Sequence, residues 1–204
     1  MVKLVHEYLS ELRSAFKLDD LAKVDAIFSE RPDLKMRRDI LGGTWLYEAA
    51  TSYSLDVLSY LVGIGFEVNS TAEQEGDTPL CSAASSGRYD NAVYLLEHGA
   101  ALDTSLSVRN PLFAAIVGGS LKIIELILKQ GIDASVEYKS PTMNRINAAS
   151  FALLNEQPEL MEAIVSHQAE GDEAKYAKLL DEVEKAVKRQ EDASPYKEWI
   201  EVKS

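Results

Sequence analysis

A short apolar pattern returns along this chain at a nearly constant spacing. The sequence TWLYEAA at residues 44–50 is followed 34 residues later by TPLCSAA at 78–84, and after a further 32 residues by NPLFAAI at 110–116. Such a period restricts a chain to architectures in which one supersecondary unit stacks on the next, because a single unit cannot bury its own apolar face. The chain therefore has to be interpreted repeat by repeat.

Each copy of the pattern is followed by a second apolar stretch, in which three residues lie at positions i, i+3 and i+4. This spacing places each trio on one face of a helix. A glycine stands three residues beyond each trio, where a left-handed helix end favours a residue without a Cβ atom. The trios with their glycines are Leu58, Leu61, Val62 and Gly65; Ala92, Leu95, Leu96 and Gly99; and Ile124, Ile127, Leu128 and Gly131. Each repeat is therefore predicted to be a pair of helices.

These units resemble the ankyrin repeat, whose period is about 33 residues and whose signature is T-P-L-H-x-A. The sequence TPLCSA at residues 78–83 matches this signature with Cys81 in place of the histidine, and GFEVN at 65–69 is similar to the family's Gly-Ala-Asp-Val-Asn ending. The resemblance implies an all-α ankyrin-repeat solenoid of about five helix-pair units with a C-terminal capping helix.

We expect the ankyrin-repeat domain to span residues 1–168, with units near 5–40, 41–74, 75–107, 108–140 and 141–168. The first and last units are weaker copies, in which Arg31 and Gln168 occupy the place of the helix-ending glycine. Residues 169–204 are expected to form the capping helix and a tail, since apolar residues follow helical spacing between 172 and 189. In the tail, Trp199 and Ile200 either pack internally or mediate a dimer. We therefore expect a monomer or a weak dimer.

No group of residues has the spacing of a catalytic or metal site. The histidines, His6, His98 and His167, are far apart in the sequence, and the second histidine that a zinc-binding helix needs after His6 is absent. Cys81 stands where the ankyrin repeat has an inward-facing histidine, which implies a small buried residue rather than a nucleophile. We therefore predict that the protein is not an enzyme and holds no metal ion or cofactor.

The chain is acidic, with 21 Lys and Arg against 33 Asp and Glu and a net charge of −12. This charge repels the phosphates of nucleic acids and anionic lipid headgroups, so we expect no nucleic acid and no membrane as partner, and a basic protein instead. The amino-terminal residues and the longest apolar stretches resemble neither a secretory signal nor a membrane-spanning helix. Together with the single cysteine, this favours a cytoplasmic location.

The negative charge is concentrated in residues 42–108, which contain one base, Arg88, and nine acids. In ankyrin repeats the residues just before the conserved threonine and just after the Ala-Ala pair face the partner, and aromatic residues among charges are typical of interfaces. The predicted partner-binding residues are Trp45, Tyr47, Thr51, Ser52, Tyr53, Glu73, Gln74, Glu75, Asp77, Ser85, Ser86, Arg109 and Asn155. The alternative is that the acidic loops only keep the stack in solution.

Two functions fit the repeat pattern and the distribution of charge. The first is a stoichiometric binder or inhibitor of a basic protein such as a secreted toxin, because the size and acidity resemble small ankyrin-type immunity proteins of bacteria. An acidic concave surface would then cover the cationic cleft of the toxin. The second is a scaffold or adaptor in a cellular complex; a hydrolase with paired carboxylates is disfavoured, since repeat stacks rarely hold a closed pocket. We expect Glu75→Lys with Asp77→Lys to weaken partner binding and to leave thermal unfolding nearly unchanged.

Overall fold

The computed structural model describes residues 4–38, 43–72, 76–139 and 145–193, and helices that follow one another in pairs dominate them. The pairs are α1 (Val5–Lys17) with α2 (Leu21–Glu30), α3 (Trp45–Ser52) with α4 (Leu55–Gly63), α5 (Pro79–Ser85) with α6 (Tyr89–Glu97), α7 (Pro111–Val117) with α8 (Leu121–Lys129), and α9 (Ala148–Leu154) with α10 (Pro158–Ala169). Short 3-10 helices, η1 (Pro32–Met36) and η2 (Ser107–Arg109), follow two of the pairs, and α11 (Glu173–Ala193) follows the last. The predicted all-α repeat solenoid is confirmed.

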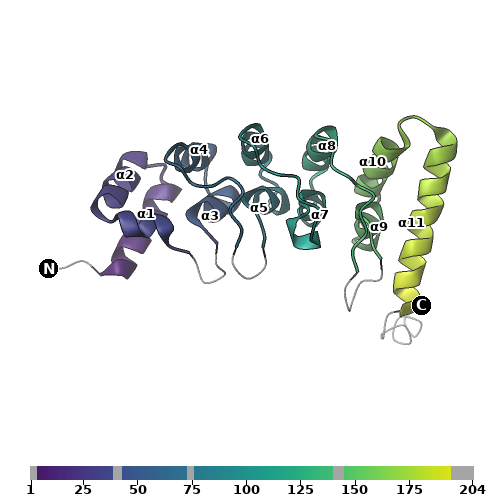
Figure 1. Cartoon of the computed structure of the whole chain (residues 1–204), viewed down its shortest axis with the longest axis horizontal. Helices are drawn as coiled ribbons and strands as arrows, with labels where there is room; N and C mark the ends of the chain where they lie inside the picture. The colour runs from purple at the N-terminus through teal and green to yellow at the C-terminus, as the bar shows by residue number, and fades with distance from the viewer. Residues whose placement is uncertain (1–3, 39–42, 73–75, 140–144, 194–204) are drawn as a thin grey trace. The chain divides into compact units, whose positions relative to one another are not determined.

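The chain divides into two compact units, Met1–Ala101 and Leu102–Ser204. The first unit holds the pairs α1/α2, α3/α4 and α5/α6, and Figure 1 shows its first helices in one row and its second helices in another. The second unit holds α7/α8, α9/α10 and α11, which packs against both α9 and α10. The boundary between the units falls in the loop that joins α6 to α7.

The residue that opens each copy of the repeated pattern caps a helix. Thr78 Oγ1 accepts a hydrogen bond from the backbone N–H of Cys81 at 3.2 Å, which satisfies one of the donors that the first turn of α5 leaves unpaired. Thr44, Asn110 and Asn147 cap α3, α7 and α9 in the same way. Pro79 and Pro111 follow two of these caps, where a missing N–H costs nothing. The recurring Thr or Asn therefore fixes where α3, α5, α7 and α9 begin.

Left-handed residues follow the second helices of the last four pairs, with one shift from the predicted place. Gly65, Gly99 and Gly131 have φ angles of +96°, +86° and +82°, as their position beyond the trios predicts. In the last pair α10 continues through Gln168, and the left-handed residues are Glu170 and Gly171. The assignment of Gln168 to the helix-ending position is therefore wrong, because α10 has 12 residues where α4, α6 and α8 have nine.

The core of each unit lies between the paired helices. The first two members of each trio are fully buried, and so are the alanines Ala49, Ala50, Ala83 and Ala84 of α3 and α5. Such small residues let neighbouring first helices pack closely, and α3 and α5 do so. At the other end of the chain, α11 buries Val183 and Ala186. It thereby covers the last pair, as the sequence predicts for a capping helix.

Candidate protein-binding surface

Two of the predicted aromatic anchors belong to the core. Trp45 is 4% exposed, and its indole Nε1 donates a hydrogen bond to the carbonyl oxygen of Leu34 at 2.8 Å. Tyr53 is 5% exposed, and its ring centroid lies 5.2 Å from that of Phe16. The expectation that these rings lie on the surface is wrong, since they fill the contact between the first and second helix pairs. Tyr47, the third predicted aromatic residue, is half-buried.

Asp77 is half-buried and holds the start of α5 in place. Its carboxylate accepts hydrogen bonds from the backbone N–H of Thr78 at 2.8 Å and from the hydroxyl of Ser82 at 3.5 Å, and also from the side chains of Tyr47 and Cys81. Burial raises the pKa of Asp77, although these hydrogen bonds favour its ionised form. These contacts lead us to expect that replacing Asp77 changes folding as well as any binding, unlike the expectation from the sequence alone.

The residues after the two Ala-Ala pairs line the ends of α3 and α5. Ser52 and Ser86 are exposed, while Thr51 and Ser85 are half-buried and donate to backbone carbonyl oxygens of their own helices. Arg88 from the next repeat donates to the carbonyl oxygens of Thr51 and Ser52, both at 3.2 Å. The hydroxyls of Thr51 and Ser85 thus bind their own helices, and the backbone of Thr51 and Ser52 binds the next repeat.

Arg109 and Asn155 belong to the second unit. Arg109 is half-buried and forms an ion pair with Asp103 at 3.6 Å. Asn155 is exposed, and its amide donates to the carbonyl oxygen of Phe151 at 2.7 Å. Each residue therefore already has an interaction partner within the second unit.

The acids of the middle repeats divide into engaged and exposed ones. Glu73, Glu75 and the neighbouring Gln74 lie outside the described residues. Glu48 accepts hydrogen bonds from Arg13 at 2.9 and 3.3 Å. Four acids of α4, α6 and the loop after α4 are exposed, namely Asp56, Glu67, Asp90 and Glu97. We call these four residues the acidic surface.

The sequence analysis missed a cluster of cations beside the first two helix pairs. A cleft of about 420 Å³ is lined by Arg13, Arg37 and Arg38, together with Trp45 and Glu48 of α3. The sequence offers one visible sign of it, the run KMRR at residues 35–38. This run alone does not predict a cleft, because α1 brings Arg13 to the same cleft from a distant point in the chain.

Packing accounts for two of the side chains that could bind a metal ion or act as a nucleophile, Cys81 and His98. Cys81 is 2% exposed, as predicted for a small core residue. The ring of His98 stacks on that of Tyr94 with centroids 3.8 Å apart. Across the described parts of the chain, no three His, Cys, Asp or Glu residues gather in a way that could hold a metal ion. Within those same parts, each helix is too short or too polar to cross a bilayer.

Comparison with known proteins agrees with the repeat geometry. The family model described as ankyrin repeats (3 copies) matches residues 12–105 and 46–138. An ankyrin repeat protein of Rickettsia felis is 34% identical over 123 residues, which are 59% of this chain and 51% of the relative. Alpha-latroinsectotoxin-Lt1a of Latrodectus tredecimguttatus is 29% identical over 121 residues, 58% of this chain and 8% of the toxin. The chain thus spans about half of one relative and less than a tenth of the other. Since the family matches cover more than half of the chain, this protein belongs to the ankyrin repeat family.

Proposed function

We propose that this chain binds a basic protein in a stoichiometric, non-catalytic complex through its acidic surface. The family supports the general part of this proposal, because ankyrin repeats are protein–protein interaction modules. The basic character of the partner is inferred from charge, since residues 42–108 carry nine acids and one base. A partner of opposite charge associates faster and is favoured over acidic competitors.

The observation that carries the proposal is the environment of that one base. The guanidinium of Arg88 donates to the carbonyl oxygens of Thr51 and Ser52 at the end of α3. It is therefore committed to the backbone of the stack, and the exposed carboxylates of Asp56 and Asp90 stay available to a partner's Lys and Arg side chains.

Inhibition of a basic toxin is one form of this function. The acidic surface would cover the toxin's cationic substrate cleft, and the complex would form in the cytoplasm of the protected cell. A neighbouring reading frame that encodes a basic toxin-like domain would favour this form. Its absence would favour an adaptor that brings a basic protein into a larger complex.

Affinity capture from native lysate, followed by mass spectrometry, tests the proposal. The test variant combines Asp56→Asn, Asp90→Asn and Glu97→Gln, three exposed acids of α4 and α6. The matched control combines Glu125→Gln, Glu159→Gln and Glu184→Gln, which remove the same charge at exposed sites of the second unit. We expect the unaltered protein and the control to retain a basic protein at low salt, and the test variant to lose it. Equal retention of the basic protein by the test variant, or capture of no basic protein by the unaltered chain, would show that the acidic surface is not the binding site.

A further inference from the structure

Three adjoining clefts run along the first two helix pairs of the first unit. A cleft of about 370 Å³ on α1 shares Leu9 and Arg13 with the cleft of about 420 Å³ already described. That cleft in turn shares Arg38 and Thr44 with a third one of about 320 Å³. Consecutive clefts have lining residues in common and therefore adjoin one another, and we call the three together the basic groove.

Among the charged residues that line the basic groove, bases outnumber acids. Its bases are Lys17 and Arg13 of α1, Lys35 of η1, and Arg37 and Arg38 of the segment that follows η1. Its acids are Glu48 and Glu67. The lining therefore carries an excess of positive charge, within a chain whose net charge is −12. Cations gathered along a depression focus their field and attract an anionic ligand.

Several of these cations are held in place by the stack. Arg13 pairs with Glu48, and its guanidinium lies 5.6 Å from the ring centroid of Trp45. Arg38 donates to the carbonyl oxygen of Thr71 at 2.9 Å, and the ammonium of Lys35 lies 5.7 Å from the ring centroid of Phe28. Contacts of this kind reduce the side-chain entropy that binding would otherwise cost.

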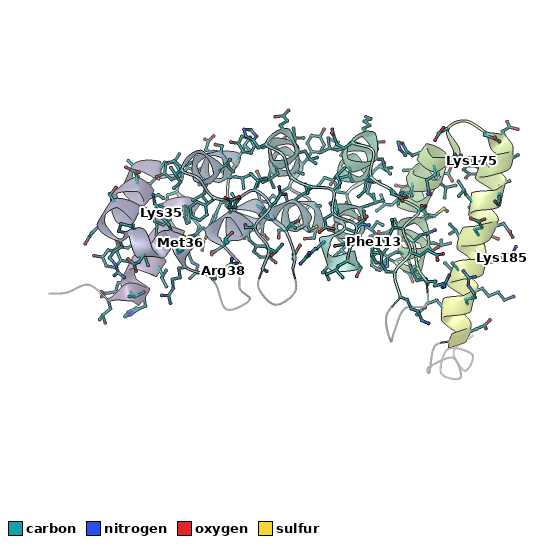
Figure 2. The ribbon with its side chains drawn as sticks, in the orientation of Figure 1. Lys35, Met36, Arg38, Phe113, Lys175 and Lys185 are labelled. Atoms are coloured by element: carbon teal, nitrogen blue, oxygen red, sulfur yellow. The ribbon has the colours of Figure 1, made fainter. Side chains whose placement is uncertain are left out.

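Apolar side chains lie among the cations. Lys35, Met36 and Arg38 stand on the segment that connects α2 with α3 (Figure 2). Met36 is 84% exposed, and Phe66 and Leu9 also line the groove. A flexible thioether adapts to partner side chains of different shapes. The groove thus offers apolar contacts next to sites for carboxylates.

We infer that the basic groove binds an extended, acidic segment of a partner protein, in which apolar residues alternate with Asp and Glu. Carboxylates would pair with Lys17 and Arg37, and an apolar side chain would pack on Met36. A peptide fits this lining better than a single-stranded nucleic acid, because nucleotide bases stack on exposed aromatic faces and the indole of Trp45 is buried. The two carboxylates of the lining would also repel a polyphosphate backbone.

The basic groove and the acidic surface share one residue, Glu67, at the edge of the third cleft, but they attract ligands of opposite charge. If both sites bind, the protein joins a basic partner to an acidic one. That outcome would favour the adaptor over the toxin inhibitor.

Fluorescence anisotropy with a labelled peptide of about twelve residues, repeating Asp-Glu-Leu, tests the groove directly; such a peptide reaches roughly 40 Å when extended. The comparison probes are the neutral Asn-Gln-Leu peptide and a thymidine oligonucleotide of about the same length. The test variant is Lys17→Gln with Arg37→Gln. The matched control, Lys23→Gln with Lys129→Gln, removes the same charge at exposed positions outside the groove, and Lys129, like Lys17, ends a helix.

We expect the acidic peptide to bind the unaltered chain and the control with affinities within about two-fold of each other, and the groove variant about ten-fold more weakly or worse. Binding should weaken as salt is raised from about 0.05 to 0.15 M, since both charges are exposed. Equal binding of the neutral peptide, an equal loss in the control, tighter binding of the oligonucleotide, or no binding of the acidic peptide would each overturn the inference. Far-UV circular dichroism confirms that the variants are folded.

Discussion

The first and third helix pairs are built on the same plan but end differently. In the third pair the turn between the helices is made by Gly87, with φ +67°, and the second helix ends at Gly99. In the first pair the turn is made by Asp19, with φ +54°, and α2 ends at Arg31 with φ −133°. The chain then enters η1 instead of the left-handed ending, and η1 leads into the cationic segment at residues 35–38.

This difference distinguishes residues that stabilise the stack from residues that are free of the repeat pattern and lie at a groove. In the regular third pair, polar side chains are engaged internally: Asp77 binds the start of α5, and Asn91 donates to the carbonyl oxygen of Ala50 at 3.2 Å. In the irregular first pair, Arg37 follows a departure from the repeat and is exposed at a groove. Buried and half-buried polar groups of the regular pair thus stabilise the stack, while the irregular pair adds basic side chains beside a cleft.

The largest expected effect concerns the contact that ties the irregular pair to the stack. Trp45→Ala should lower the free energy of unfolding by about 3–5 kcal/mol, because it removes a buried aromatic side chain and its hydrogen bond to Leu34. Urea unfolding followed by circular dichroism measures this loss. Leu80→Ala, at a fully buried position of the third pair, is the comparison, with an expected loss of about 2–5 kcal/mol. A loss below about 1 kcal/mol for Trp45→Ala would mean that the first pair is only loosely attached.

The next effect tests whether Asp77 serves the stack. At pH 7, Asp77→Lys should lower the free energy of unfolding by about 1–3 kcal/mol, since the donors of Thr78 and Tyr47 lose their acceptor. Urea unfolding of this variant measures the loss. An unchanged free energy of unfolding would show that Asp77 does not stabilise the stack.

The pH dependence of Asp77 gives an independent check. Because burial raises the pKa of its carboxyl in the folded state, the folded protein holds this proton more tightly than the unfolded chain does. The part of the stability that depends on this proton is therefore fully present below the unfolded pKa of about 3.9 and is lost as the pH rises through the folded pKa, while the hydrogen bonds of the ionised carboxylate remain. The difference in unfolding free energy between the unaltered protein and Asp77→Asn should accordingly fall from pH 4 upward. A difference that rises with pH would contradict the burial of this group.

The smallest effect compares the two inter-helix turns. Gly87→Ala should lower the free energy of unfolding by about 1–2 kcal/mol, because a Cβ atom is disfavoured at φ +67° even though it would meet no neighbouring atom within 4 Å. Asp19→Gly relieves the same strain but removes the acceptor of the Ser54 hydroxyl, so its net change should stay within about 0.5 kcal/mol. Thermal unfolding of both variants measures the contrast. A loss for Asp19→Gly as large as that for Gly87→Ala would show that the Asp19 hydrogen bond, not its backbone strain, dominates the first turn.

The repeat made most of the fold predictable from the sequence. Thr78 and Asn110 cap helices because their side chains accept backbone N–H groups, and Gly99 ends a helix because its φ is positive; both requirements are local and leave a pattern in the sequence. The candidate site was harder to predict. Trp45 lies among charged residues in sequence but packs on residues of the preceding repeat, and Arg13 reaches the basic groove from about 25 positions away along the chain. Contacts between repeats determine where Trp45 and Arg13 lie, and such contacts leave no pattern in the neighbouring sequence.

The most direct test of the account is a map of backbone amide chemical shifts in the isotope-labelled protein, with two peptide probes of opposite charge. The acidic Asp-Glu-Leu peptide should shift amides of α1 and residues 35–38. Its counterpart with lysine in place of the acids should shift those near Asp56 and Asp90 in α4 and α6. Separate sets of shifted residues would support a division between an irregular basic groove and a regular acidic surface. Shifts of the same residues by both probes, or of α6 by the acidic peptide, would contradict it.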